Sequence, residues 1–150
     1  MIFAHLLIGI VLGQLFGGTP WFVLGSLLPD IDHIYVMLKN RFWSIRKIRD
    51  SLEFEDKHGV RYKTPLLHSV LGAAILTAAI FFLQRPAALP FGIAYLLHLL
   101  VDWLDVDEKR FLFPFNMKFR GFLQIWSRVE QAVTVLLLIL LTLVLLSKMG

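Results

Sequence analysis

Apolar residues form five segments along the chain, separated by turns or by more polar stretches. The segments cover residues 1–16, 21–38, 66–83, 91–104 and 129–146. The last segment has polar residues only at its start and at Thr142, and it approaches the length of about 20 residues that crosses a bilayer. The pattern predicts an all-α fold, an integral membrane bundle of about five apolar helices that forms one domain over residues 1–150.

Glycine and proline mark the breaks between and within these segments. Gly17-Gly18-Thr19-Pro20 predicts a turn after the first segment. Pro29 is expected to kink or divide the second segment, because proline cannot donate a helical hydrogen bond. The longest polar stretch, 39–63, interleaves basic residues with aromatic and aliphatic ones, and this spacing suits an amphipathic helix on a membrane surface.

The composition supports a membrane protein. Hydrophobic residues make up 57% of the chain and the mean hydropathy is +0.71, whereas soluble domains contain roughly 45–50% apolar residues. The chain has no cysteine, which excludes disulfides and thiolate metal sites. The net charge of +4 is a weak signal for nucleic acid, so membrane lipids are the expected partners and no nucleic acid is expected.

The distribution of basic residues predicts an orientation. If all five segments span, the N-terminus and the connections 39–65 and 105–128 lie on one side, which carries thirteen of the fifteen Lys and Arg residues. Arg85 and Lys148 lie on the other side. The positive-inside rule then places the N-terminus and both long connections in the cytoplasm, with the chain in the inner, cytoplasmic membrane.

Ionisable residues recur at the predicted cytoplasmic end of every segment. Apolar segments rarely carry such groups unless something compensates their burial, and accidental polar residues would not favour one end of each helix. A divalent metal is the simplest compensator, because carboxylates and imidazoles are its usual ligands. The candidate metal ligands are His5, Asp30, Asp32, His33, His68, His98 and Asp102, and Glu130 lies at the same depth.

Each group also has a plainer interpretation when it is considered alone. Asp30 and Asp32 could be capping carboxylates at a helix break. His98 and Asp102, four residues apart on one helix face, could form a buried hydrogen-bonded pair. A lone histidine or glutamate at a helix start is explained as well by local hydrogen bonds or by the helix dipole. The metal hypothesis therefore depends on these residues meeting at one depth.

The types of candidate ligand limit which metal is expected and which residue acts as a base. Histidine-rich ligand sets without sulfur favour Zn²⁺, while Mn²⁺, Fe²⁺ and Mg²⁺ remain alternatives. Asp32 or Glu130 is the predicted general base of a metal-assisted reaction. His58 and the acidic run that begins at Asp105 are interpreted as solvated.

Three blocks of sequence resemble the YdjM-like family. They are Leu28-Pro29-Asp30-Ile31-Asp32-His33, then His68-Ser69-Val70-Leu71, then Gly92-Ile93-Ala94-Tyr95-Leu96-Leu97-His98-Leu99-Leu100-Val101-Asp102. An early His5, a Pro114-Phe115 pair and a late Glu130 complete the family order over almost the whole chain. Members of the family are described as inner-membrane, metal-dependent hydrolases, some under SOS-type control. A distant likeness to zinc phospholipase C implies a phosphoester substrate.

The chain departs from the family pattern where Lys63 stands in place of a histidine. The leading hypothesis is a membrane-bound metal-dependent hydrolase that acts on a phosphoester, such as a phospholipid, at the cytoplasmic interface. The departure favours an alternative, a non-catalytic membrane protein with a structural metal or a buried polar cluster. A metal or ion transporter is a third hypothesis, which the lack of an evident repeat makes less attractive.

Overall fold

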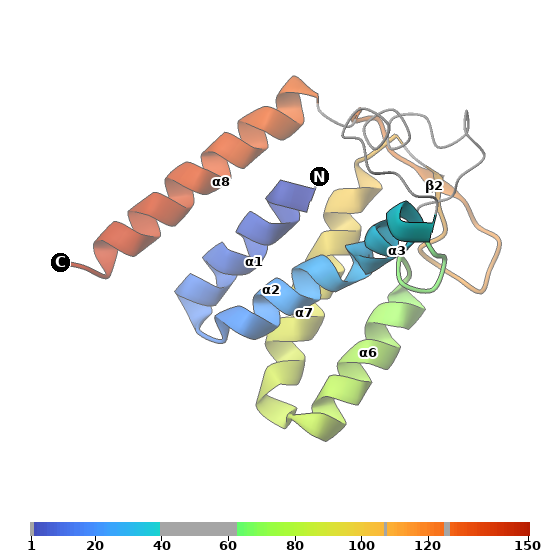
Figure 1. Ribbon diagram of the computed structural model, residues 1–150, viewed down its shortest axis with the longest axis horizontal. Helices are drawn as coiled ribbons and strands as arrows, with labels where there is room; N and C mark the ends of the chain where they lie inside the picture. Colours follow the sequence, from blue (N-terminus) through green and yellow to red (C-terminus); the bar gives the residue numbers. More distant parts are fainter. Residues whose placement is uncertain (1, 40–62, 107, 125–126) are drawn as a thin grey trace.

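The described part of the chain is a helical bundle with one small hairpin (Figure 1). The computed structural model describes residues 2–39, 63–106, 108–124 and 127–150. The elements in chain order are α1 (Ile2–Phe16), α2 (Thr19–Leu27), the 3-10 turn η1 (Leu28–Asp30), α3 (Ile31–Lys39), α6 (Val70–Leu83), α7 (Arg85–Trp103), β1 (Glu108–Lys109), β2 (Phe119–Arg120) and α8 (Arg128–Ser147). The all-α prediction is confirmed, and the antiparallel β1–β2 pair is an addition that the hydrophobic pattern does not predict.

Both predicted breaks near the N-terminus are confirmed. Gly17 and Gly18 have φ angles of 79° and 73°, in the left-handed region that favours glycine, and they reverse the chain between α1 and α2. Pro29 lies in η1, which separates α2 from α3. The predicted amphipathic segment 39–63 falls almost entirely on residues outside the described ranges.

Two helices begin at other residues than the pattern predicts. α6 starts at Val70, because Ser69 caps it with a side-chain oxygen that accepts from the Gly72 N–H at 3.1 Å. α7 starts already at Arg85. Pro86 stands in its first turn, where a missing N–H breaks no helical hydrogen bond.

The helices pack in the order α8, α1, α2, α7, α6, each against the next. Figure 1 shows α8 beside α1, away from α6. Lys148, just beyond the end of α8, donates to the backbone carbonyl of Gln14 near the end of α1. α1 and α8 therefore run in the same direction, and α8 starts at the end of the bundle where α1 starts.

Small residues let the backbones approach closely, as is common between membrane helices. A Cβ on Gly25 would collide with the backbone carbonyl oxygen of Phe91, so α2 and α7 touch there without a side chain between them. A Cβ on Gly9 would collide with the side-chain hydroxyl of Ser26 and with the backbone of Val23, so α1 and α2 are also close there. These contacts fix the relative register of the three helices that carry most of the polar cluster described below.

The hydrophobic core lies between α6 and α7. Its buried members are Ala73, Phe91, Tyr95 and Leu99. The Tyr95 hydroxyl donates to the backbone carbonyl of Leu67 at 2.6 Å and so ties the turn before α6 to α7.

Two described helices, α7 and α8, are long and apolar enough to cross a membrane. With 19 and 20 residues, they reach about 28 and 30 Å at about 1.5 Å per residue. α1 and α6 have 15 and 14 residues and reach about 22 and 21 Å, short of the roughly 30 Å of a hydrocarbon core. The prediction of five spanning segments is not confirmed, and the orientation in the membrane stays a prediction.

The chain after α7 folds back onto the end of that helix. Asp105 bridges to Leu123, and the Gly121 N–H donates to the Asp105 carbonyl at 2.9 Å. Asp105 is only 2% exposed, so its interpretation as a solvated residue is wrong. The returning strand covers it, and that tertiary contact cannot be inferred from the polar local sequence.

Gly25→Ala tests whether backbone contact between α2 and α7 holds the bundle together. The added methyl group must displace the Phe91 carbonyl, and overpacking of this kind costs about 1–3 kcal/mol. This cost should outweigh the gain of about 1 kcal/mol in helix propensity and lower the thermal unfolding midpoint in detergent. Gly150→Ala, which meets no neighbour within 4 Å, is the control and should leave the midpoint unchanged. A raised midpoint in Gly25→Ala would contradict the close contact.

Candidate metal centre

Four separate parts of the chain bring polar side chains together at one end of the bundle. His5 lies near the start of α1, Asp30 in η1, His68 in the turn before α6, and His98 and Asp102 near the end of α7. All five residues are buried, with exposed fractions of 8% or less. They belong to groups whose ligand atoms lie within 4.8 Å of one another and could hold a metal ion. The structure thus assembles the predicted cluster, while the role of each residue as a ligand stays a prediction.

Four of these side chains form a closed ring of potential ligand atoms. His68 Nε2 lies 3.7 Å from Asp30 Oδ1 and 3.7 Å from Asp102 Oδ2. His98 Nε2 lies 3.7 Å from the same Asp30 oxygen and 3.8 Å from the same Asp102 oxygen. A tetrahedral metal with bonds of about 2.0–2.2 Å holds its ligand atoms about 3.3–3.6 Å apart. The ring needs to contract by only a few tenths of an ångström to match that geometry.

The two histidine Nε2 atoms in this ring of ligands have no other partner within the described residues. His68 Nε2 and His98 Nε2 are buried and accept or donate no hydrogen bond within the described residues, and buried polar atoms are rarely left so. The Nδ1 of His98 donates to the backbone carbonyl of Ser26 at 2.8 Å. Because a carbonyl can only accept, this bond fixes the proton on Nδ1 and leaves the lone pair of Nε2 directed at the ring. The donor set and its geometry fit a divalent metal.

Asp32 stands behind the ring. Its Oδ2 lies 3.3 Å from His68 Nδ1 and accepts from the Thr64 N–H at 2.6 Å. Its Oδ1 pairs with His33 Nδ1 at 2.9 Å. Both carboxylate oxygens are therefore engaged. The Asp32–His68 contact is an ion pair, and His68 Nδ1 makes no hydrogen bond within the described residues, so Asp32 stands where a carboxylate could orient that histidine.

His5 and His33 occupy the two edges of the cluster. The Nε2 of His5 lies 3.2 Å from Asp102 Oδ1, the oxygen that the ring does not use, and its ring stacks on His98 at 3.9 Å between centroids. His33 lies 3.5 Å from Asp30 Oδ1 through the same nitrogen that pairs with Asp32. The geometry places both histidines beside the ring, in contact with its carboxylates.

Lys63 is a member of the cluster that sequence reasoning does not include among the site residues. Its Nζ lies 2.9 Å from Asp102 Oδ2 and 3.7 Å from Asp105 Oδ2. Asp105 also belongs to the cluster, but it lies beyond the end of α7 and is buried by the strand that returns at Leu123, so the local sequence carries no signal for it. For Lys63 the only signal is the departure from the family pattern.

Glu130, the other predicted general base, lies in the first turn of α8. It is 9% exposed, and its backbone N–H is capped by the Ser127 hydroxyl at 3.3 Å. α8 begins at the same end of the bundle as α1, so Glu130 shares the end of the molecule but not the described contacts of the ring. Its role as a base stays a prediction. His58 lies outside the described residues.

Charges within the cluster shift the titration of the groups that lie outside α7 and α8. Burial by itself lowers the pKa of His68, but the carboxylates of Asp30 and Asp32 outweigh it and raise that pKa to about 9. Burial raises the pKa of Asp105, although Lys63 opposes this. In the absence of metal, His68 is therefore protonated at neutral pH.

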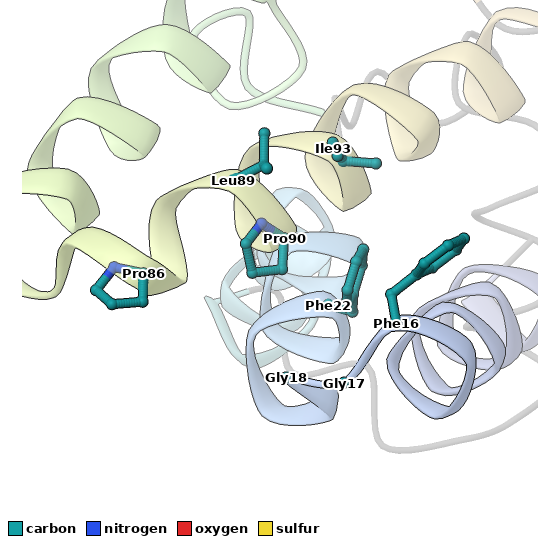
Figure 2. Close-up of a pocket in the computed structure, with 8 residues that line it drawn as sticks. All are labelled: Phe16, Gly17, Gly18, Phe22, Pro86, Leu89, Pro90 and Ile93. Atoms are coloured by element: carbon teal, nitrogen blue, oxygen red, sulfur yellow. The ribbon is translucent and has the colours of Figure 1, made fainter.

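A separate apolar pocket of about 430 Å³ opens at the opposite end of the bundle (Figure 2). Phe16, Phe22, Leu89 and Ile93 line it, together with glycines and prolines. Phe16 is eleven residues beyond His5 on α1, which separates the two sites by about 16 Å along that helix. None of the residues that line this pocket is ionisable.

Removal of a ring histidine should abolish metal binding. His68→Ala and His98→Ala each delete a buried nitrogen that has no other partner, so both should reduce the bound metal of detergent-purified protein at least tenfold. Elemental analysis after equilibration with Zn²⁺ measures this. Lys118→Ala, which removes a side chain of an exposed ion pair with Glu108, is the control and should keep the metal. Full metal in a folded His98→Ala variant would contradict the ring.

Metal binding should release a proton. The metal-free pKa of His68 is about 9, and a ligand nitrogen must be deprotonated, so metal and proton compete at neutral pH. The apparent affinity should therefore rise with pH between about 6 and 9, by up to about tenfold per pH unit for one exchanged proton. Calorimetric titrations in buffers of different ionisation enthalpy measure the proton count. A pH-independent affinity without proton release would contradict this assignment.

Comparison with known proteins adds a family. No curated protein and no solved structure matches the chain. A family model described as YdjM inner membrane protein matches residues 1–149, which is nearly the whole chain. This match agrees with the order of blocks in the sequence and with two helices that could span a membrane. The chain therefore belongs to the YdjM family of inner membrane proteins.

Proposed function

We propose that this chain is a membrane-bound, metal-dependent hydrolase whose metal is held by Asp30, His68 and His98, with Asp102 shared between the metal and Lys63. One observation carries the proposal: two buried ring nitrogens without any hydrogen-bond partner face the same two carboxylate oxygens at 3.7–3.8 Å. A cluster built only for internal pairing would satisfy those nitrogens. Zn²⁺ suits this set of nitrogen and oxygen donors best, with Mn²⁺ and Mg²⁺ as alternatives.

A hydrolase needs an open coordination position, and Lys63 supports one here. Structural zinc sites use four protein ligands, whereas catalytic sites keep three and leave one position open. The ammonium of Lys63 lies 2.9 Å from the Asp102 oxygen that belongs to the ring, and it therefore competes for that oxygen. Asp30, His68 and His98 are then the three full ligands, two histidines and one carboxylate, and Asp102 is shared with Lys63.

Access to the site is from one edge. Among the cluster side chains, those of His33, Lys63 and Asp30 keep exposed fractions of 16%, 12% and 10%, while those of His98 and His68 are 0% and 2% exposed. A substrate would thus approach between α3 and the turn that carries Lys63. A divalent ion bound there would activate a water molecule near neutral pH and polarise a phosphoryl oxygen.

The residues around the ring have separate roles in this proposal. Asp32 holds the orientation of His68, and the Ser26 carbonyl holds that of His98. Glu130 is the candidate for a general base, because both oxygens of Asp32 are already engaged. A phosphoester is the proposed substrate class, and exposed basic residues of the hairpin, such as Arg120, lie after the ligand-bearing end of α7.

Hydrolysis of a phosphodiester tests the proposal. Detergent-purified protein loaded with Zn²⁺ or Mn²⁺ should hydrolyse bis-p-nitrophenyl phosphate or phosphatidylcholine in mixed micelles, and a chelator should stop the reaction. His98→Ala should lose the activity, and Lys118→Ala, in an exposed pair with Glu108, should keep it. Metal-loaded protein that hydrolyses neither substrate would overturn the enzymatic part of the proposal.

Asp32→Asn separates positioning from base catalysis within the same assay. A positioning role predicts an apparent metal Kd raised about 10–100-fold, with kcat largely restored when metal is saturating. A base role predicts normal metal binding and a kcat lowered about 10²–10⁴-fold.

The second candidate function is a structural metal site in a non-catalytic membrane protein. The observation in its favour is the ring itself, which offers four protein donors and so could close the coordination shell. This candidate predicts stoichiometric metal, a large loss of thermal stability with chelator, and no hydrolysis.

A further inference from the structure

The two carboxylates that follow each other at the end of α7 share one cation. Lys63 Nζ lies 2.9 Å from Asp102 Oδ2 and 3.7 Å from Asp105 Oδ2. Both carboxylates are 2% exposed, and Lys63 comes from the segment that precedes α6. The ammonium group thus bridges two buried carboxylates that are 39 and 42 positions away in the sequence.

Two buried carboxylates at this spacing need positive charge nearby. Each loses its hydration on burial, and their mutual repulsion adds to that cost. Lys109 supplies a second ammonium 3.7 Å from Asp105 Oδ2. The Oδ1 of Asp105 has no hydrogen-bond partner within the described residues. The pair is therefore a site for cations that lysine side chains fill from within the chain.

A charge count over the cluster gives the number of metal ions it can balance. Among the described residues, its carboxylates are Asp30, Asp32, Asp102 and Asp105, and its ammonium groups are Lys63 and Lys109. Four negative charges less two positive charges leave two negative charges when the histidines are neutral. One divalent ion balances that remainder, and a second would leave an excess of positive charge in a buried place.

We propose that the Lys63 ammonium is a built-in second cation of the metal centre, so that the protein binds a single divalent ion and the Asp102–Asp105 pair is a latent second metal site. This inference rests on the metal centre of the proposed function and adds the number of ions to it. Asp102 is the shared element, because its Oδ2 faces both the ring nitrogens and Lys63. A metal in place of the ammonium would be bridged to the first by Asp102.

The same contacts argue against Lys63 as a direct anchor for an anionic substrate. Its side chain is 12% exposed and already lies within 4 Å of two carboxylates. An anion that bound the ammonium would have to approach those carboxylates and would be repelled by them. The fixed positive charge acts within the centre instead.

The experiment counts metal ions in variants at position 63. Wild-type protein equilibrated with Mn²⁺ should carry one ion per chain by elemental analysis and give the spectrum of isolated Mn²⁺ in electron paramagnetic resonance. Lys63→His replaces the ammonium by a neutral ligand, and this variant should carry two ions with an exchange-coupled spectrum, because Asp102 would bridge them. Lys118→His, on the exposed hairpin, is the matched control and should stay at one ion.

Lys63→Met keeps the proposal testable if Lys63→His does not fold. It removes the charge without adding a ligand, so its thermal midpoint should fall below that of the wild type and rise again with excess Mn²⁺. A Lys63→Met protein with the wild-type midpoint would overturn the proposal.

The outcomes separate this inference from the proposed function. A wild-type chain without bound metal would overturn both. One ion in the wild type and one ion in folded Lys63→His would overturn only the built-in cation and leave the metal centre in place. Two ions in the wild type would also overturn only the built-in cation, because Lys63 would then not exclude a second metal ion.

Discussion

The burial of several carboxylates between apolar helices is the constraint on which the rest of this structure depends. Asp30, Asp32, Asp102 and Asp105 are all 8% exposed or less, and each would be costly there without a cation or hydrogen bonds. The chain meets part of this demand itself, through Lys63 and Lys109. The remaining demand falls where two histidine nitrogens make no hydrogen bond within the described residues, and a divalent metal could meet it.

The precision of the site comes from backbone contact between helices. Gly25 allows α2 to touch the backbone of α7, and the adjacent Ser26 carbonyl can then accept from His98 at 2.8 Å. A side chain at position 25 would move that carbonyl away, and the hydrogen bond that fixes the proton of His98 on Nδ1 would be lost. Small residues therefore serve the chemistry as well as the packing, because close helices bring a backbone acceptor to a ligand.

Much of the fold and the outline of the site follow from the sequence. Successive apolar segments run in opposite directions, so the start of one and the end of the next lie at the same end of the bundle. His5 and His68 stand at the starts of their segments, and Asp30 and His98 stand nearer the ends of theirs, so all four converge. Helical spacing alone places His98 and Asp102 on one face. The sequence does not predict which residues form the ring and which lie beside it. That depends on which imidazole nitrogen of each histidine is already bound by a neighbouring group. The burial of Asp105 is not predicted, because the strand that covers it comes from residues 119–123 and the local sequence gives no signal for that contact.

The position of Lys63 decides between a closed and an open metal site. Four donor atoms, with 3.7–3.8 Å between each histidine nitrogen and each carboxylate oxygen, would fill the coordination shell of a tetrahedral ion and leave no place for water. An ammonium 2.9 Å from one of those donors changes this balance, because Asp102 cannot give the same oxygen fully to both cations. In the proposed metal centre, Asp30 and the two histidines would then be the full ligands, on the side of the cluster where Asp30, His33 and Lys63 keep some exposure. A lysine that looks like the loss of a ligand in the sequence would thus keep one coordination position available in the proposed metal centre, and this is the arrangement that a reactive site needs.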